Sequence, residues 1–289
     1  MNIDSFNQSN LFIGTSGYSY GEWIDSGFYP QGTNSSNMFD IYTQYFYTTE
    51  LNYTWYQMPK AAAIARMCQK APQNFKFAAK LTRTMTHEIK RGCWQKEVMS
   101  YRVGIKPLIQ SEKLLCILIQ LPPWFERTVK FRQYLAALLD ELAGLPLAVE
   151  FRHDSWVNDK VFYEFEKRKI TLVSVDAPGV PGLFPRLDVV TNSDLFYIRF
   201  HGRNAEGWGS GNMQKQFDYD YSSLEIHQWA GIIKDNIMPK ALAGGIFFNN
   251  HVRGQAPKNA LALMEILSDK NSKSDKVNHT AKNTYKISA

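Results

Sequence analysis

The strongest constraint on the fold is a regular alternation of short apolar runs with helix-like stretches. Eight runs have the length of a buried strand: LFIGTS (11–16), TTELNY (48–53), FKFAAKL (75–81), LLCILIQL (114–121), LAVEFRH (147–153), TLVSVD (171–176), LFYIRFHG (195–202) and AGGIFFNN (243–250). Helix-like segments follow five of them: AAAIARMCQK (61–70), TVKFRQYLAALLDEL (128–142), NDKVFYEFEKRK (158–169), SSLEIHQWAGIIKDN (222–236) and PKNALALMEIL (257–267). Strands that alternate with helices of this length predict βαβ units and a parallel sheet.

Eight such units predict a single (β/α)8 TIM-type barrel of the α/β class, a fold that typically takes about 250 residues. The expected barrel domain covers residues 11–268, after an N-terminal lead over residues 1–10. Residues 269–289 are polar and contain almost no large apolar side chain, so we expect this tail to remain disordered.

Two long loops interrupt the alternation. The segment APGVPGLFPRLDVVTNS (177–193) contains three prolines and two glycines, which exclude a helix of normal length. The barrel is therefore expected to be irregular between strands 6 and 7, with a loop over its mouth. TRTMTHEIKRGCW (82–94) is the second loop. Loops of this size in a compact domain are more often functional than idle.

Several features predict a cytoplasmic protein without a membrane partner. No apolar run approaches the roughly 20 residues that span a bilayer. The start, MNIDSFNQSN, lacks the basic and apolar regions of a signal peptide. The three cysteines lie far apart and form no CxxC pair, so neither a disulfide framework nor a zinc ribbon is indicated.

The net charge of +6 does not by itself predict a nucleic-acid partner. Half of it belongs to the tail, which carries five lysines and two aspartates, so the expected folded body is only mildly basic.

Polar side chains recur near the carboxyl ends of seven of the predicted strands. Because side chains of a barrel strand alternate between the interior and the helix layer, the sequence indicates which of them point inward. The inward set is Glu50, Asn52, Lys80, Gln120, Glu150, Arg152, Asp176, Arg199, His201 and Asn249. Barrel enzymes place their chemistry at this end of the strands, so the set predicts a binding pocket there.

Segments carrying these residues resemble domain-of-unknown-function family 72, the YecE-like proteins. The matching segments are IGTSGYSYGEW (13–23), FYP (28–30), ELNYTWYQMP (50–59), FKFAAKLTRTMTH (75–87), LIQLPP (118–123), VEFRHDSW (149–156), YIRFHGR (197–203), YSSLEIHQWA (221–230), FFNN (247–250) and GQAPKNA (254–260). Trp55 stands where the family usually has Phe, and His251 where an acidic residue is common. The resemblance runs from about residue 11 to residue 267 and implies a TIM-type barrel and a set of site positions, but no reaction.

The residue types suggest two groups of roles. Glu50, Glu150, Asp176 and His201 are candidate acids or bases, because carboxylates in adjacent positions and inward histidines can exchange protons. Lys80, Arg152 and Arg199 suit an anion, since arginine grips carboxylate or phosphate oxygens bidentately. The remaining substrate-binding candidates are Asn52, His87, Gln120, Arg203 and Asn249, of which His87 is supported by the family match.

The inward cations also bear on metals and on stability. Carboxylates and histidines are suitable metal ligands, but three cations in the same space oppose a divalent ion. We therefore predict no metal and no cofactor. Mutual repulsion among the cations predicts that Arg199→Met would not lower the melting temperature.

Three functions remain open. The favoured one is an enzyme that acts on, or binds, a small anionic molecule, for example a phosphorylated one. The second is a nucleic-acid binding or phosphodiester-cleaving barrel similar to endonuclease IV, in which Tyr18, Tyr20, Trp23, Trp55 and Trp208 would stack on bases. The third is a ligand-binding protein without catalysis. The sequence predicts no oligomeric state.

Overall fold

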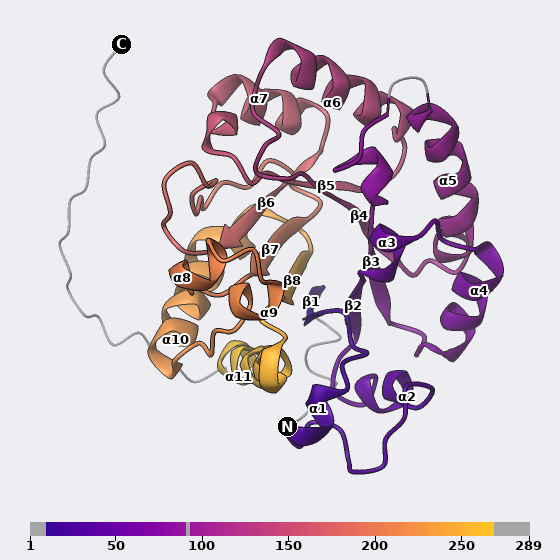
Figure 1. Ribbon diagram of the computed structural model, residues 1–289, viewed down its shortest axis with the longest axis vertical. Coiled ribbons are helices and arrows are strands. Elements are labelled where there is room, and N and C mark those ends of the chain that lie inside the picture. The colour runs from indigo at the N-terminus through magenta and orange to yellow at the C-terminus, as the bar shows by residue number, and fades with distance from the viewer. Residues whose placement is uncertain (1–9, 91–92, 269–289) are drawn as a thin grey trace.

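The strands close into a barrel of eight parallel strands that follow one another in chain order (Figure 1). The computed structural model describes residues 10–90 and 93–268. The strands are β1 (Leu11–Ser16), β2 (Thr48–Leu51), β3 (Lys76–Lys80), β4 (Leu114–Gln120), β5 (Leu147–Glu150), β6 (Thr171–Asp176), β7 (Phe196–Phe200) and β8 (Gly244–Phe248). Each lies within one of the eight apolar runs, so the predicted TIM-type barrel is confirmed. The tail and nearly all of the N-terminal lead lie outside the described residues.

Helices surround the strands, with α4, α5, α6 and α7 along the outside of the ring in Figure 1. The helices of eight or more residues are α4 (Ala61–Lys70), α5 (Trp94–Gln110), α6 (Val129–Glu141), α7 (Asp159–Lys167), α10 (Ser223–Ile232) and α11 (Gln255–Ser268). Shorter ones are α1 (Glu22–Asp25), α2 (Met38–Tyr42), α3 (Tyr53–Tyr56), α8 (Ala205–Trp208) and α9 (Met213–Gln216). All five predicted helices are present. No helix of the described residues is long and apolar enough to cross a membrane.

The crossover between β6 and β7 contains no helix. The two strands nevertheless pair directly, with Val173 opposite Tyr197. Thr191 anchors the crossover, because its hydroxyl accepts from the Leu172 amide at 2.9 Å and donates to the Ile170 carbonyl at 2.7 Å. The predicted irregularity between strands 6 and 7 is thus confirmed, and the part over residues 180–183 reaches the mouth of the barrel.

The alternation of side chains in β7 positions the site. Phe200 points to the helix layer, where its ring lies 4.9 Å from Trp229 of α10. Tyr197 points inward and stacks on Phe247 of β8 at 4.9 Å. Arg199 is inside as well, and the chain then turns at Gly202, whose φ of +87° favours glycine. The strand therefore delivers an aromatic and a charged side chain to the interior, one above the other.

Candidate functional site

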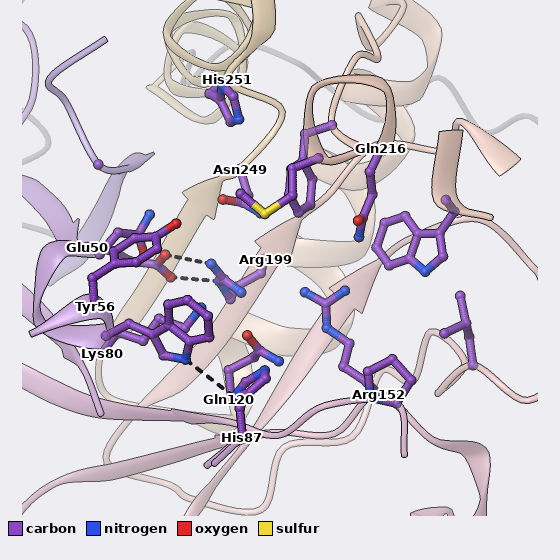
Figure 2. Close-up of a pocket in the computed structure, with 18 of the residues that line it drawn as sticks. Glu50, Tyr56, Lys80, His87, Gln120, Arg152, Arg199, Gln216, Asn249 and His251 are labelled. Carbon is purple, nitrogen blue, oxygen red and sulfur yellow. Dashed lines mark hydrogen bonds and ion pairs between the residues drawn. The ribbon is translucent and has the colours of Figure 1, made fainter. Parts of the chain in front are cut away.

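A cavity of ≈ 970 Å³ opens at the carboxyl ends of the strands. The strands and the residues directly after them supply its polar floor, and Figure 2 shows these side chains. They are Glu50, Lys80, Gln120, Arg152, Arg199 and Asn249. Its walls come from α3, from the loop after β1, from the crossover and from α8 and α9. The cavity thus lies where the sequence predicted it.

Arg199 and Glu50 form the centre of the floor. The Arg199 guanidinium donates from Nε and Nη2 to the two carboxylate oxygens of Glu50, at 2.8 Å each (Figure 2). The Tyr197 hydroxyl donates to the same carboxylate at 2.6 Å. All three side chains are almost completely buried. Both oxygens of Glu50 are therefore occupied by protein donors.

Glu150 is bound in the same way by two arginines and a histidine. Arg199 donates from Nη1 to Oε2 of Glu150 at 2.6 Å, and Arg152 donates from Nε to Oε1. Nε2 of His201 lies 3.1 Å from Oε1 of Glu150, and Nδ1 lies 3.1 Å from Nδ2 of Asn249. A proton on Nε2 satisfies both contacts, because Nδ1 then accepts from the amide, and Nη2 of Arg152, which also lies 3.1 Å from Nε2, finds no acceptor there. A continuous chain of alternating charges links Glu50, Arg199, Glu150 and Arg152.

This chain determines the charge state of its members. Burial would raise the pKa of the Glu150 carboxyl, but the positive charges of Arg152 and Arg199 hold it well below its usual range. Burial would lower the pKa of Arg199, but Glu150 and Glu50 outweigh it and raise the value. Burial, followed by the charge of Arg152, lowers the pKa of His201 to about 3. At neutral pH Glu150 is therefore negatively charged between two guanidiniums, and His201 is uncharged.

The expectation that free cations repel one another on the floor is therefore wrong for Arg199. Its positive charge lies between two buried carboxylates. The error arose because alternation along one strand gives the direction of a side chain but not its partner on another strand.

Arg152 differs from Arg199 because part of its guanidinium remains available. Its Nη1 makes no hydrogen bond with any described residue, and Figure 2 shows the group pointing into the open centre of the cavity. Its Cζ lies 5.2 Å from the ring of Trp208, so an aromatic face flanks the charge. The N–H groups that remain are directed at the space that a ligand would occupy.

Lys80, at the end of β3, is the other cation of the floor with free donors. Its Nζ lies 5.1 Å from the centre of the Trp55 ring and makes no hydrogen bond or ion pair within the described part of the chain. Burial, followed by the charge of Arg199, lowers the pKa of Lys80 to about 7. The amine is thus poised between its charged and neutral forms near neutral pH.

The predicted candidates Asn52, His87 and Gln120 also line the cavity, whereas the predicted His201 is fully buried and does not line it. Gln120 donates from Nε2 to the Leu121 carbonyl at 2.9 Å, and the buried Oδ1 of Asn52 has no hydrogen-bond partner among the described atoms. The Trp55 indole donates to Nδ1 of His87 at 3.3 Å. Burial, followed by the charge of Lys80, lowers the pKa of His87 to about 4, so this imidazole is neutral at physiological pH.

Asp176 and Arg203 do not reach the cavity, and the predicted inward direction of Asp176 is wrong. The Asp176 carboxylate faces the helix layer, where it accepts from the Trp229 indole at 2.6 Å and from the Tyr221 hydroxyl at 2.9 Å. Arg203 donates to both of its oxygens, at 2.9 and 2.6 Å. In β6 it is Val173 and Val175 that pair with the inward Tyr197 and Arg199. Both predicted site residues thus belong to a buried network that joins the barrel to α10.

Aromatic side chains form much of the cavity wall. Four of the five aromatics proposed for stacking line it, namely Tyr18, Tyr20, Trp55 and Trp208. Trp23 does not, because it is fully buried and its indole donates to the His251 carbonyl at 2.7 Å. Met213, Gln216 and Phe217 of the α9 region also line the cavity and were not predicted. No local pattern marks so short a helix, and only the glycine-rich stretch before it indicates a loop.

The charged groups that line the cavity differ in how far they are already bound. Among the described residues that line the cavity, Glu50 is the only carboxylate, and its oxygens are already bound. Within residues 10–90 and 93–268, no group of three or more His, Cys, Asp or Glu side chains is placed to hold a metal ion. The free donors of Lys80 and Arg152 can instead bind negatively charged oxygens.

Comparisons with known proteins relate the chain to one family. The family described as "Protein of unknown function DUF72" matches residues 12–284. UPF0759 protein YunF of Bacillus subtilis is 28% identical over 273 residues, which cover 89% of this chain and 94% of that protein. A DUF72 family protein from Thermotoga maritima superimposes with a TM-score of 0.81 at 32% identity, over 90% of this chain and 99% of that one. One from Enterococcus faecalis gives a TM-score of 0.79 at 26% identity, over 94% and 100% of the two chains.

Proposed function

The chain belongs to the DUF72 family of proteins of unknown function. We propose that the mouth of its barrel binds a small organic anion and that the protein acts on this anion as an enzyme. One observation carries the proposal. Lys80 and Arg152 line the same cavity with N–H donors that have no partner among the described residues, while the carboxylates of Glu50 on the floor and of the buried Glu150 are occupied by arginines. An incoming carboxylate or phosphate therefore finds donors and no competing negative charge.

The cavity also indicates the size and character of the ligand. Its volume of ≈ 970 Å³ is at the upper end of small-molecule sites, which typically measure about 300–1,000 Å³. The rings of Trp55, Trp208 and Phe217 supply flat apolar walls. A ligand with a charged end and an apolar or planar body satisfies both parts of the site.

Ligand-induced stabilisation tests the proposal. We expect mandelate, a small aromatic carboxylate, and inorganic phosphate each to raise the melting temperature. A ligand at about a hundredfold excess over its dissociation constant adds roughly 2.7 kcal/mol to the free energy of unfolding. Arg152→Met removes the available guanidinium and should abolish most of this shift. Arg132→Met, an exposed position of α6, is the matched control and should retain it.

Two results would contradict the proposal. If neither anion stabilises the protein, the barrel mouth is not an anion site. If the shift survives in Arg152→Met at full size, the anion binds elsewhere.

A single-stranded nucleic acid is the second candidate, favoured by a groove beside the main cavity. The groove has a volume of ≈ 510 Å³ and shares His87 with the cavity. Its lining includes the aromatic and basic residues Trp94, Trp124, Phe131, Tyr134, Lys90 and Lys130. Aromatic faces interleaved with cations are typical of surfaces on which bases stack. This candidate requires an affinity for oligonucleotides that falls steeply with salt and is reduced in Trp124→Ala.

A further inference from the structure

We propose that Lys80 is a catalytic nucleophile, whose amine attacks a carbonyl group of the bound anion and forms an imine. The proposal rests on the anion-binding function above and names the ligand class. The ligand is an organic anion that also carries a carbonyl group, with a ketone or aldehyde close to its carboxylate or phosphate. Arg152 would bind the charged end while Nζ of Lys80 reaches the carbonyl carbon.

Within residues 10–90 and 93–268, the Lys80 amine has no counter-ion. Glu50 lines the same cavity, and the buried Glu150 is near enough for its charge to act on the amine, so these are the two carboxylates that could pair with it. Arg199 occupies both oxygens of Glu50, and Arg199 and Arg152 divide those of Glu150 between them. An amine that is held only by the face of Trp55 is free to turn toward a ligand.

The electrostatics of the floor favour the neutral, reactive form of this amine. An ordinary lysine has a pKa of 10.5, so only about one amine in a thousand is neutral near pH 7.5. Burial and the neighbouring charge of Arg199 lower the pKa of Lys80 to about 7. More than half of the Lys80 amines are then neutral at that pH, and a neutral amine is the species that attacks carbonyl carbon.

The covalent step balances without a further reagent. The lone pair of Nζ forms a bond to the carbonyl carbon, and the π electrons move to the oxygen. One Nζ proton passes to that oxygen, which gives a carbinolamine. With one more proton from solvent the C–O bond breaks, water leaves, and a protonated imine remains. The indole face of Trp55 is suited to stabilise this cation, because aromatic faces attract positive charge.

Reductive trapping on the full chain tests the proposal. Phenylglyoxylate, an aromatic 2-oxo acid, is incubated with the protein and cyanoborohydride, and the modified lysine is located by peptide mass mapping. We expect a secondary amine at Lys80, formed at a rate that is half-maximal near pH 7. Lys76 is the internal control, because it lies at the other end of β3 and donates to the Glu112 carbonyl at 2.5 Å. It should remain unmodified under these conditions.

The matched anion mandelate, which carries a hydroxyl in place of the carbonyl, separates the two proposals. If mandelate stabilises the protein but phenylglyoxylate forms no adduct at Lys80, the proposal that Lys80 is a nucleophile is wrong and the anion-binding function is unaffected. An adduct at Lys80 with uncharged propanal, but no stabilisation by mandelate or phosphate, would support the nucleophile and contradict the anion-binding function. Adducts at Lys76 and Lys80 in equal amounts would overturn the special reactivity of Lys80.

Discussion

Arg199 binds both carboxylate oxygens of Glu50 at 2.8 Å inside the barrel, and its remaining nitrogen reaches Glu150. Glu50 belongs to β2, Glu150 to β5 and Arg199 to β7, so one guanidinium joins three strands that are not neighbours in the barrel. Such a group stabilises the fold through its partners, because removing it leaves the buried Glu50 without a counter-charge and Glu150 with Arg152 alone.

The first prediction follows from this pair. Arg199→Met should lower the free energy of unfolding by about 3–5 kcal/mol, the usual effect of removing one partner from a buried ion pair. Urea denaturation measures the change. Lys169→Met removes a solvent-exposed ion pair with Asp194 and should cost under about 1 kcal/mol. If Arg199→Met is as stable as wild type, the two ion pairs do not stabilise the fold and the expected repulsion among the cations is correct.

The second prediction concerns Asp176, which was expected in the cavity but faces the helix layer. Asp176→Asn should lower stability by about 3 kcal/mol, since Arg203 and the Trp229 indole lose a shared buried acceptor. The melting shift caused by mandelate should remain unchanged. Asp194→Asn, at an exposed ion pair, controls for loss of charge. If Asp176→Asn unfolds with the same free energy as wild type but its melting temperature no longer rises with mandelate, Asp176 contributes to ligand binding.

The third prediction is a pH dependence of stability that arises from Lys80. Its pKa is about 7 in the folded state and 10.5 in an ordinary lysine, so between these values the unfolded chain binds more protons. Stability must then rise with pH through this window. Wild type should gain more stability than Lys80→Met between pH 7 and about pH 9 in urea denaturation. Lys76→Met should behave as wild type, and parallel profiles for wild type and Lys80→Met would contradict the lowered pKa.

The fourth prediction concerns the acid side and His87. Its pKa is about 4 in the folded state against 6.5 ordinarily, so the unfolded chain binds more protons between these values. Stability should fall as pH decreases through this range, and less so in His87→Asn. His227→Asn, an exposed change on α10, should follow wild type. If His87→Asn loses as much stability in acid as wild type, His87 is already charged in the folded protein.

The barrel itself could be predicted because its signal is local and repeated. Each buried strand is a short apolar run bounded by turn residues, and eight of them recur at barrel spacing. Helix α5 was not assigned, since Gly104 and Pro107 interrupt its pattern. Gly104 is needed where the helix meets Pro59, because a Cβ there would lie 2.2 Å from the Pro59 carbonyl oxygen. That packing requirement is invisible in the helix's own sequence.

The position of the cavity could be predicted, but only some of the contacts among the side chains around it could be. Alternation placed Arg199 inside correctly, and it would have placed Tyr197 there too, two residues earlier on the same face. It failed at Asp176 because the outer face of β6 is polar at that point, where Trp229 and Tyr221 of a distant segment supply donors. Arg199 is 149 positions from Glu50 and 49 from Glu150 in the chain. Pairing over such separations has no local signature, so only the fold shows that two carboxylates balance the charge of Arg199.

The polar floor belongs to the strands, whereas the aromatic walls belong to connecting segments such as those that carry Tyr20, Trp55 and Trp208. The two parts are therefore free to diverge at different rates. A substitution in a connecting segment changes which uncharged part of a ligand fits the cavity and leaves the buried ion pairs of the floor intact. A substitution in the floor breaks those ion pairs and lowers the stability of the whole barrel. Selection for a new ligand would accordingly change the wall residues first. Related proteins could then differ in ligand specificity while binding the charged group of the ligand in the same way.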